Sequence, residues 1–301
     1  MSLSNDFNSR IKIAKPNEVD LFRTLTDSLR YKGVSVKEFH GCKGIVEFDI
    51  NHLGSTFQKR CEICDLLLVF IHPEEIRFTF LQNKYTRRFI AANIIPKVNA
   101  SQHYLLSTRP IFNPLFTGLP NNILNDALID GAGSFGNFYF NGKSFDMSYF
   151  VATSLKPTSK LTKLCLHKGY NRKYISTTVP YPALIYNHLF FEAAFCENLD
   201  DFESASSKML IGSPAYNDNV KGYLINISKY IINNLDKNKL ENIERDKISN
   251  IKNSLNLLSK NTNFSYDYEK YKQISESTIL FDCSSAIIKE RTAIAILDGL
   301  R

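Results

Sequence analysis

The sequence contains no apolar run long enough to span a membrane. The apolar stretch 184–196 is interrupted by Asn187, His188 and Glu192, whereas a transmembrane helix requires about 20 consecutive, predominantly apolar residues. The first residues, MSLSNDFNSR, also lack the apolar segment of a signal peptide. We therefore expect a cytoplasmic protein that has no membrane partner.

The six cysteines lack the spacing of a small disulfide-bonded domain, which favours reduced thiols. His40-x-Cys42 and Cys61-x-x-Cys64 do contain the ligand types of a tetrahedral zinc site. Cys64 adjoins an apolar strand, however, whereas a zinc knuckle places both cysteines of its C-x-x-C motif in a tight turn. We interpret these cysteines as core residues and keep zinc binding as the alternative.

Local signatures of serine and cysteine hydrolases are also missing. The sequence has no G-x-S-x-G nucleophile elbow. No histidine lies four residues from another; the six are His40, His52, His72, His103, His167 and His188. A Cys–His hydrolase therefore has no local support, although catalytic partners can be distant in sequence.

Two long segments lack acidic residues, and the net charge of the chain is +7. No Asp or Glu occurs between Glu75 and Asp126 or between Met147 and Phe191. Basic segments of this kind suit a polyanion, because each neutralised phosphate releases counterions. We predict nucleic-acid contacts at Arg77, Arg87, Arg88, Lys163, Lys168, Arg172 and Lys173. A solvated basic face without a partner is the alternative.

The central feature of the sequence is a pair of apolar runs that predicts a β-hairpin. Residues 61–71 and 76–84 are rich in Val, Ile, Phe and Thr and are separated by a short break, 72–75. Asp65 opens the first strand, while Gln82 and Lys84 stand two residues apart on the second. Because side chains alternate along a strand, Gln82 and Lys84 share a face and can meet Asp65.

An Asp at the start of one strand, followed by a polar-x-Lys at the end of the next, resembles the PD-(D/E)XK nuclease core. The Gln-x-Lys form is similar to the Mrr-like branch of that superfamily. Over residues 15–110, the resemblance implies that Asp65, Gln82 and Lys84 are catalytic and that Asp65 and Gln82 bind Mg²⁺ or Mn²⁺. The sequence departs from the pattern at Cys64, where the family has proline, and at Gln82, which replaces an acid.

The chemistry of phosphodiester hydrolysis explains such a group of residues. A hard divalent cation held by oxygen ligands neutralises charge on the phosphate and activates water. Lys84 would orient the water or stabilise the transition state. Because Gln82 is neutral, a further carboxylate is expected from Glu18, Glu47 or Glu62. We favour Glu18, because members of the superfamily often contribute an acid from the preceding helix. The alternative is a strand cap at Asp65 and a solvated Lys84.

The predicted fold is α/β (α+β), with a restriction-endonuclease-like core of a mixed sheet flanked by helices and a largely helical C-terminal half. We divide the chain into a flexible N-terminus (1–15), a nuclease-like core (16–115) and an accessory DNA-binding or oligomerisation half (116–301). At 301 residues and 44% hydrophobic content, the chain can bury a substantial core. The first predicted element is a helix from Pro16 to before Gly33, with Val19 on its apolar face. Strands are predicted at 44–50 and 104–108, with a loop at 54–56 and an irregular connection at 111–120. Two further helices are predicted at 220–235 and 243–258. The apolar stretch 279–300 is expected to pack on the body.

A glycine-rich segment, 131–136, matches G-x-G-x-x-G letter for letter. Nucleotide binding requires a strand before this motif and a helix after it. Here residues 122–129 are typical of a helix and residues 137–140 of a strand. The reversed order favours a simple glycine-rich turn over a dinucleotide site.

The leading hypothesis is a metal-dependent DNA endonuclease that serves in restriction or other defence against foreign DNA. The rivals are a nuclease of the same fold that cuts RNA or structured DNA, and a non-catalytic nucleic-acid-binding or assembly protein. Cutting both strands of a duplex commonly requires two active sites, which suggests a homodimer. A second carboxylate facing Asp65 would favour catalysis, whereas its absence would favour the binding protein.

Overall fold

The structure is a computed structural model. It describes residues 1–34, 44–52, 55–86, 94–96, 98–115, 118–127, 129–157, 163–166, 174–179, 188–235, 242–260 and 278–285.

The predicted hairpin is confirmed and lies at the centre of the fold. β4 (Leu66–Ile71) and β5 (Ile76–Thr86) pair antiparallel, with Leu66 opposite Leu81 and Ile71 opposite Ile76. His72 and Glu75 close the turn with backbone hydrogen bonds of 3.0 and 3.3 Å. All six residues of β4 are buried, as expected for a strand covered on both faces.

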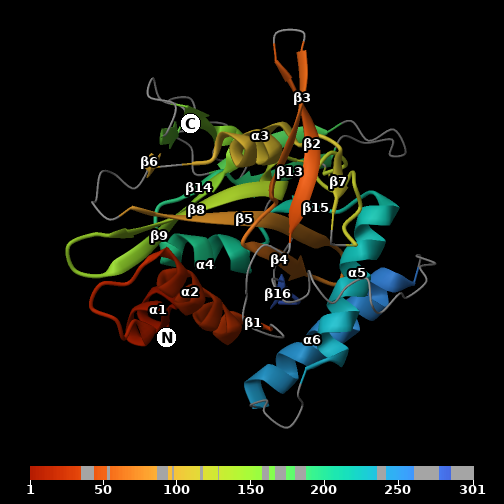
Figure 1. Cartoon of the computed structure of the whole chain (residues 1–301). Coiled ribbons are helices and arrows are strands. Elements are labelled where there is room, and N and C mark those ends of the chain that lie inside the picture. The colour runs from red at the N-terminus through yellow and green to blue at the C-terminus, as the bar shows by residue number, and fades with distance from the viewer. Residues whose placement is uncertain are drawn as a thin grey trace.

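A mixed sheet grows from this hairpin in the order β1-β16-β4-β5-β8-β9-β14, and β15 also pairs with β5 (Figure 1). The added strands are β1 (Gly33–Val34), β8 (Gly133–Phe140), β9 (Phe145–Val151), β14 (Phe195–Cys196), β15 (Ser213–Pro214) and β16 (Thr278–Asp282). β16 runs parallel to β4 and β8 runs parallel to β5, whereas the other pairs are antiparallel. The predicted mixed α/β architecture is confirmed, and strands from both sides of residue 115 share this sheet.

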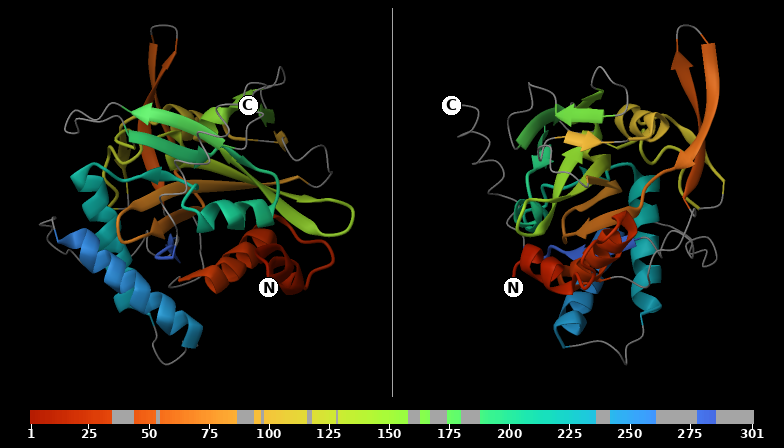
Figure 2. Two further views of the ribbon diagram at one scale, coloured as in Figure 1. Left: turned by 180° about the vertical axis from the view of Figure 1, so that it is seen from behind. Right: turned by 60° about the vertical axis from the view of Figure 1, so that its left-hand side comes forward.

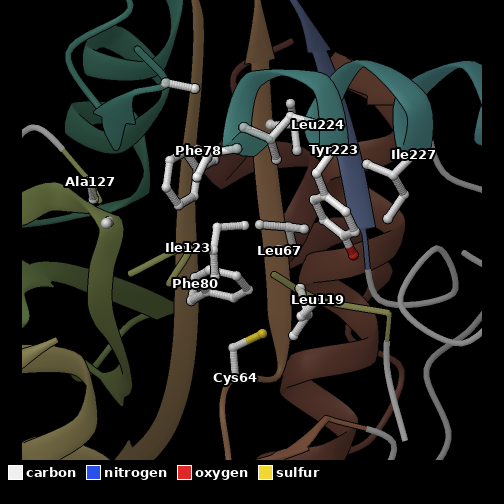
Figure 3. Packing of buried hydrophobic residues seen from close by; sticks show 14 of the residues in the cluster. Cys64, Leu67, Phe78, Phe80, Leu119, Ile123, Ala127, Tyr223, Leu224 and Ile227 are labelled. Atoms are coloured by element: carbon white, nitrogen blue, oxygen red, sulfur yellow. The ribbon is translucent and has the colours of Figure 1, made fainter. Parts of the chain in front are cut away.

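Helices cover both faces of the sheet (Figures 1 and 2). α1 (Leu3–Arg10), α2 (Glu18–Lys32) and α4 (Leu199–Ser207) pack with Leu66, Leu68 and Phe70. On the other face, α3 (Ala100–Thr108), α5 (Asp218–Asn233) and α6 (Asn242–Ser259) pack with Leu67, Val69 and Phe78. Figure 3 shows Leu67 and Phe78 beside Leu224 of α5. The alternation of side chains along β4 thus supplies both cores.

α2 confirms the predicted first helix and fixes the position of Glu18. Asn17 and Asp20 form a reciprocal cap, in which each side chain accepts a hydrogen bond of 3.0 Å from the other's backbone N–H. Leu21, Leu25 and Leu29 are buried. Val19 is 54% exposed and does not join the apolar face that was predicted to contain it.

A two-stranded arm projects from the body (Figure 2). It consists of β2 (Ile45–His52) and β3 (Ser55–Glu62), and β7 (Phe112–Pro114) pairs with the base of β2. The strand predicted at 44–50 is therefore confirmed. The predicted loop at 54–56 is wrong for Ser55 and Thr56, which begin β3 because they pair with His52 and Asn51; residue 54 lies outside the described residues. The connection predicted at 111–120 contains β7.

Two other local predictions are wrong. Residues 104–108 belong to α3 rather than to a strand, because Asn99 caps the helix and its Leu105 and Leu106 are buried against the sheet. Residues 121–126 form turns instead of a helix, and 128 is outside the described residues. The glycine-rich segment that follows spans a short 3₁₀ helix (Asp130–Ala132) and the start of β8, so no helix follows the motif.

The remaining elements complete the outer parts of the fold. The helices predicted at 220–235 and 243–258 are confirmed as α5 and α6, whereas their connection at 236–241 lies outside the described residues. The smaller sheets contain β6 (Ile94–Pro96), β10 (Leu155–Pro157), β11 (Lys163–Leu166), β12 (Tyr174–Val179) and β13 (His188–Ala193), and a 3₁₀ helix (Ala152–Ser154) precedes β10. No helix in the described segments is both long and apolar enough to cross a membrane.

Candidate active site

The candidate site lies where β5 continues beyond the start of β4. β4 begins at Leu66, opposite Leu81, whereas β5 extends to Thr86 and pairs there with β8. Along the edge that β4 leaves open, the backbone N–H of Asn83 donates to Asp65 Oδ2 at 2.5 Å. The backbone N–H of Tyr85 donates to Glu18 Oε2 at 3.0 Å. Two carboxylates from different elements are thus held side by side on one strand edge.

Asp65 is fixed by the sheet and only partly exposed. Its backbone N–H donates to the Leu81 carbonyl at 3.0 Å, which anchors the residue at the mouth of the hairpin. Burial raises the pKa of its carboxyl to about 6. The Asn83 N–H, the charge of Lys84 and a hydrogen bond from Gln82 oppose that rise by favouring the carboxylate, whereas Glu18 adds to it.

Gln82 and Lys84 meet Asp65 as the hairpin predicts, and both interact with its carboxylate. Gln82 is 3% exposed, and its Oε1 accepts a hydrogen bond of 2.9 Å from Gln102 Nε2. Lys84 Nζ lies 3.9 Å from Glu18 Oε1. The sequence-predicted group of Glu18, Asp65, Gln82 and Lys84 is therefore brought together.

Glu62, the last residue of β3, adds a third carboxylate to the group. Burial first, and then the charge of Asp65, raise the pKa of Glu62 to about 7, while Lys84 lowers it. Its Oε1 is buried without a hydrogen-bond partner. A buried carboxylate oxygen without a partner is costly, so this atom is suited to bind a cation.

The oxygen atoms of this site fit a magnesium-like ion that keeps part of its water shell. In the described part of the chain, no three His, Cys, Asp or Glu side chains are arranged to hold a metal. Mg²⁺ commonly needs only one or two carboxylates, together with water and substrate phosphate. Asp65 and the unpartnered oxygen of Glu62 are the acidic groups that could supply this pair.

Glu47, the other acid considered, lies on the arm and binds Arg60 and Gln58 instead. The predicted nucleic-acid contact at Arg77 is wrong for this fold, because its side chain is fully buried. Arg77 Nε donates to Glu75 at 2.5 Å, and its Nη1 donates to the Gly212 carbonyl at 3.3 Å. Of the other predicted contacts, Arg87, Arg88, Lys168, Arg172 and Lys173 lie outside the described residues, as does the side chain of Lys163 in β11.

The structure describes two of the four residues proposed for the alternative zinc site. Cys61 and Cys64 are free thiols, while His40 and Cys42 lie outside the described residues. Burial raises the pKa of Cys61 to about 12 and that of Cys64 well above its ordinary value. Without a metal ion, both are therefore held as thiols.

Gln102 is the site residue that sequence reasoning missed. It lies on α3, is 8% exposed, and donates to both the Gln82 side chain and, at 3.4 Å, the Glu62 carbonyl. Asn99 directly before Ala100 was an available helix-start signal. No sequence pattern indicated that this helix would face Gln82.

The raised pKa of Glu62 predicts a stability change with pH in the metal-free protein. Since its pKa rises from 4.5 to about 7, the folded chain binds this proton more tightly than the unfolded chain. The contribution of this proton to the free energy of unfolding is fully present below pH 4.5 and is lost as pH rises through 7. Because Glu62 is only partly buried, solvent screening reduces this contribution to about 1 kcal/mol. In EDTA, we expect the wild type to lose more stability between pH 5 and 8 than Glu62→Gln.

Thermal unfolding at pH 5, 6, 7 and 8 measures this difference. Glu47→Gln is the matched control, because this arm carboxylate binds Arg60 and lies away from Asp65. Parallel pH curves for the wild type and Glu62→Gln would contradict the assigned environment of Glu62.

Comparison of the chain with protein-family models, curated proteins and solved structures finds no match.

Proposed function

We propose that this protein is a metal-dependent nuclease that hydrolyses phosphodiester bonds in DNA. The observation that carries the proposal is the presence of Glu18 and Glu62 beside Asp65 and Lys84, since a second carboxylate is what separates a catalytic site from a binding fold. The net charge of +7 supports a polyanionic substrate.

Each residue has a role that its position supports. Asp65 and Glu62 would hold a Mg²⁺ or Mn²⁺ ion, with Gln82 as the neighbouring neutral group. When bound, the ion supplies positive charge to a phosphate oxygen and lowers the pKa of a water molecule. Lys84 places a fixed positive charge where negative charge develops on the phosphate. Glu18 orients Lys84 through the 3.9 Å ion pair and caps the Tyr85 N–H.

The balance of charge in the site supports the need for a cation. Three carboxylates surround one ammonium group, and burial raises the pKa of two of them. A divalent cation would relieve the repulsion between Glu62 and Asp65 and complete the charge needed to approach a phosphate.

The test is to incubate purified protein with plasmid DNA and with single-stranded RNA, in Mg²⁺, Mn²⁺ or EDTA. We expect nicking or linearisation of DNA in either metal and none in EDTA. Cleavage of RNA alone would replace DNA as the substrate. Salt-sensitive DNA binding without cleavage of any substrate would favour a binding protein.

A further inference from the structure

The amide groups of Gln82 and Gln102 form a short chain with a defined direction. Gln102 Nε2 donates to two acceptors, the Glu62 backbone carbonyl at 3.4 Å and Gln82 Oε1 at 2.9 Å. A backbone carbonyl can only accept, so it favours the orientation in which the Gln102 nitrogen faces this side. Gln102 then requires an acceptor from Gln82, and the Gln82 oxygen turns toward α3.

The other end of the Gln82 side chain follows from this direction. With its oxygen bound to Gln102, Gln82 has its amide nitrogen left to face Asp65, where it favours the charged form of that carboxyl and lowers its pKa. An amide nitrogen has no lone pair for a metal ion, whereas an amide oxygen is a suitable ligand. In this structure, the Gln82 nitrogen therefore faces Asp65, and the Gln82 oxygen is not available there as a metal ligand.

We infer that Gln102 is a positioning residue that holds Gln82 in a non-ligating orientation and so restrains metal binding at Asp65. The inference rests on the proposed function for the identity of the ligand, a hard divalent cation. For Gln82 to ligate a metal ion, its amide must rotate so that its oxygen faces the ion, and this rotation breaks the bond from Gln102.

The packing of α3 keeps Gln102 in place. Asn99 caps the helix through a 2.8 Å bond to the Ser101 N–H, and the neighbouring Leu105 and Leu106 are fully buried. Gln102 and Gln82 are themselves 8% and 3% exposed, so water does not readily replace either amide partner. The restraint is therefore built into the contact between α3 and the sheet.

The first test measures Mn²⁺ affinity without nucleic acid, by calorimetry and by the electron paramagnetic resonance signal of free Mn²⁺. Gln102→Met removes the donor while keeping an unbranched side chain of similar length. We expect this variant to bind Mn²⁺ about 5-fold more tightly, the equivalent of one net hydrogen bond. Gln58→Met is the control, because it removes an exposed amide on the arm that donates to Glu47. This variant should bind Mn²⁺ with the wild-type affinity.

A double-mutant cycle shows whether the effect passes through Gln82. In the Gln82→Met background, Gln102→Met should no longer alter Mn²⁺ affinity, because no amide remains to reorient. Weaker or unchanged binding by Gln102→Met alone would overturn the inference. The same gain in both backgrounds would overturn it as well.

A second measurement tests the amide orientation without metal or activity. The protein is labelled with ¹⁵N in its glutamine and asparagine residues. The Gln82 amide protons should then show a nuclear Overhauser effect to the Asn83 backbone N–H, because that N–H binds Asp65 and the Gln82 amide nitrogen faces the same carboxylate. Contacts from the Gln82 amide protons to the Gln102 side chain instead would overturn the inference. If these results hold but no polynucleotide is cut, the proposed function fails and the amide arrangement stands.

Discussion

Asp65→Asn is expected to reduce nucleic-acid cleavage at least about 100-fold, the scale of removing a key electrostatic group from an active site. The asparagine side chain has the same shape, and its Oδ1 can still accept the Asn83 N–H. It loses the negative charge that a cation requires. The loss should therefore appear in the cleavage rate at saturating substrate, measured in Mg²⁺ and in Mn²⁺.

Stability separates this loss from unfolding. Burial raises the pKa of Asp65 to about 6, so ionisation at pH 8 costs folding free energy in the metal-free protein. Asp65→Asn should then melt at or above the wild-type temperature at pH 8 in EDTA. Asp49→Asn, which changes an exposed arm carboxylate, should keep full activity. Wild-type cleavage by Asp65→Asn would show that hydrolysis occurs elsewhere.

Gly133→Ala is expected to give the largest loss of stability among single-methyl changes in the sheet. A Cβ at this position would lie 2.4 Å from the Leu106 carbonyl oxygen and 3.0 Å from its carbonyl carbon. These are backbone atoms of α3 and cannot move as a flexible side chain can. Overpacking of this kind costs about 1–3 kcal/mol and occasionally more. Thermal and urea unfolding measure the loss directly.

The same substitution should also disturb the amide chain, because moving α3 moves Gln102 away from Gln82. Gly142→Ala is the matched control, since a Cβ there has no heavy atom within 4 Å, although the φ of +96° makes alanine strained. Its cost should remain near 1 kcal/mol, within the usual range for backbone strain. Equal losses at Gly133 and Gly142 would contradict a packing origin for the first.

The elements that could be predicted are those with a strong local pattern. The hairpin at 66–86 has uniform apolar strands around a short turn, and α2, α5 and α6 have apolar residues at helical spacing. α3 was missed because its Leu105-Leu106 pair, followed by Ser107 and Thr108, is equally typical of a strand. Its Asn99 cap decides the conformation.

The site was predictable along the hairpin and less so across the fold. Asp65, Gln82 and Lys84 follow from strand alternation within one hairpin. The positions of Glu62 and Gln102 relative to Asp65 are set by the packing of the arm and of α3 against the sheet. Local sequence patterns do not predict such tertiary packing. Arg77 was misassigned because charge alone does not show that a side chain is buried with Glu75.

The place of β16 in the sheet bears on how the protein is made. β4 pairs with β5, its neighbour in the chain, but its other edge is completed by β16, which is synthesised long afterwards. Throughout that interval on the ribosome, a wholly apolar strand has an open edge, the state most prone to pairing with other chains. The same strand begins beside Asp65. A nascent or truncated chain that stops before residue 278 therefore has a central strand without its parallel neighbour.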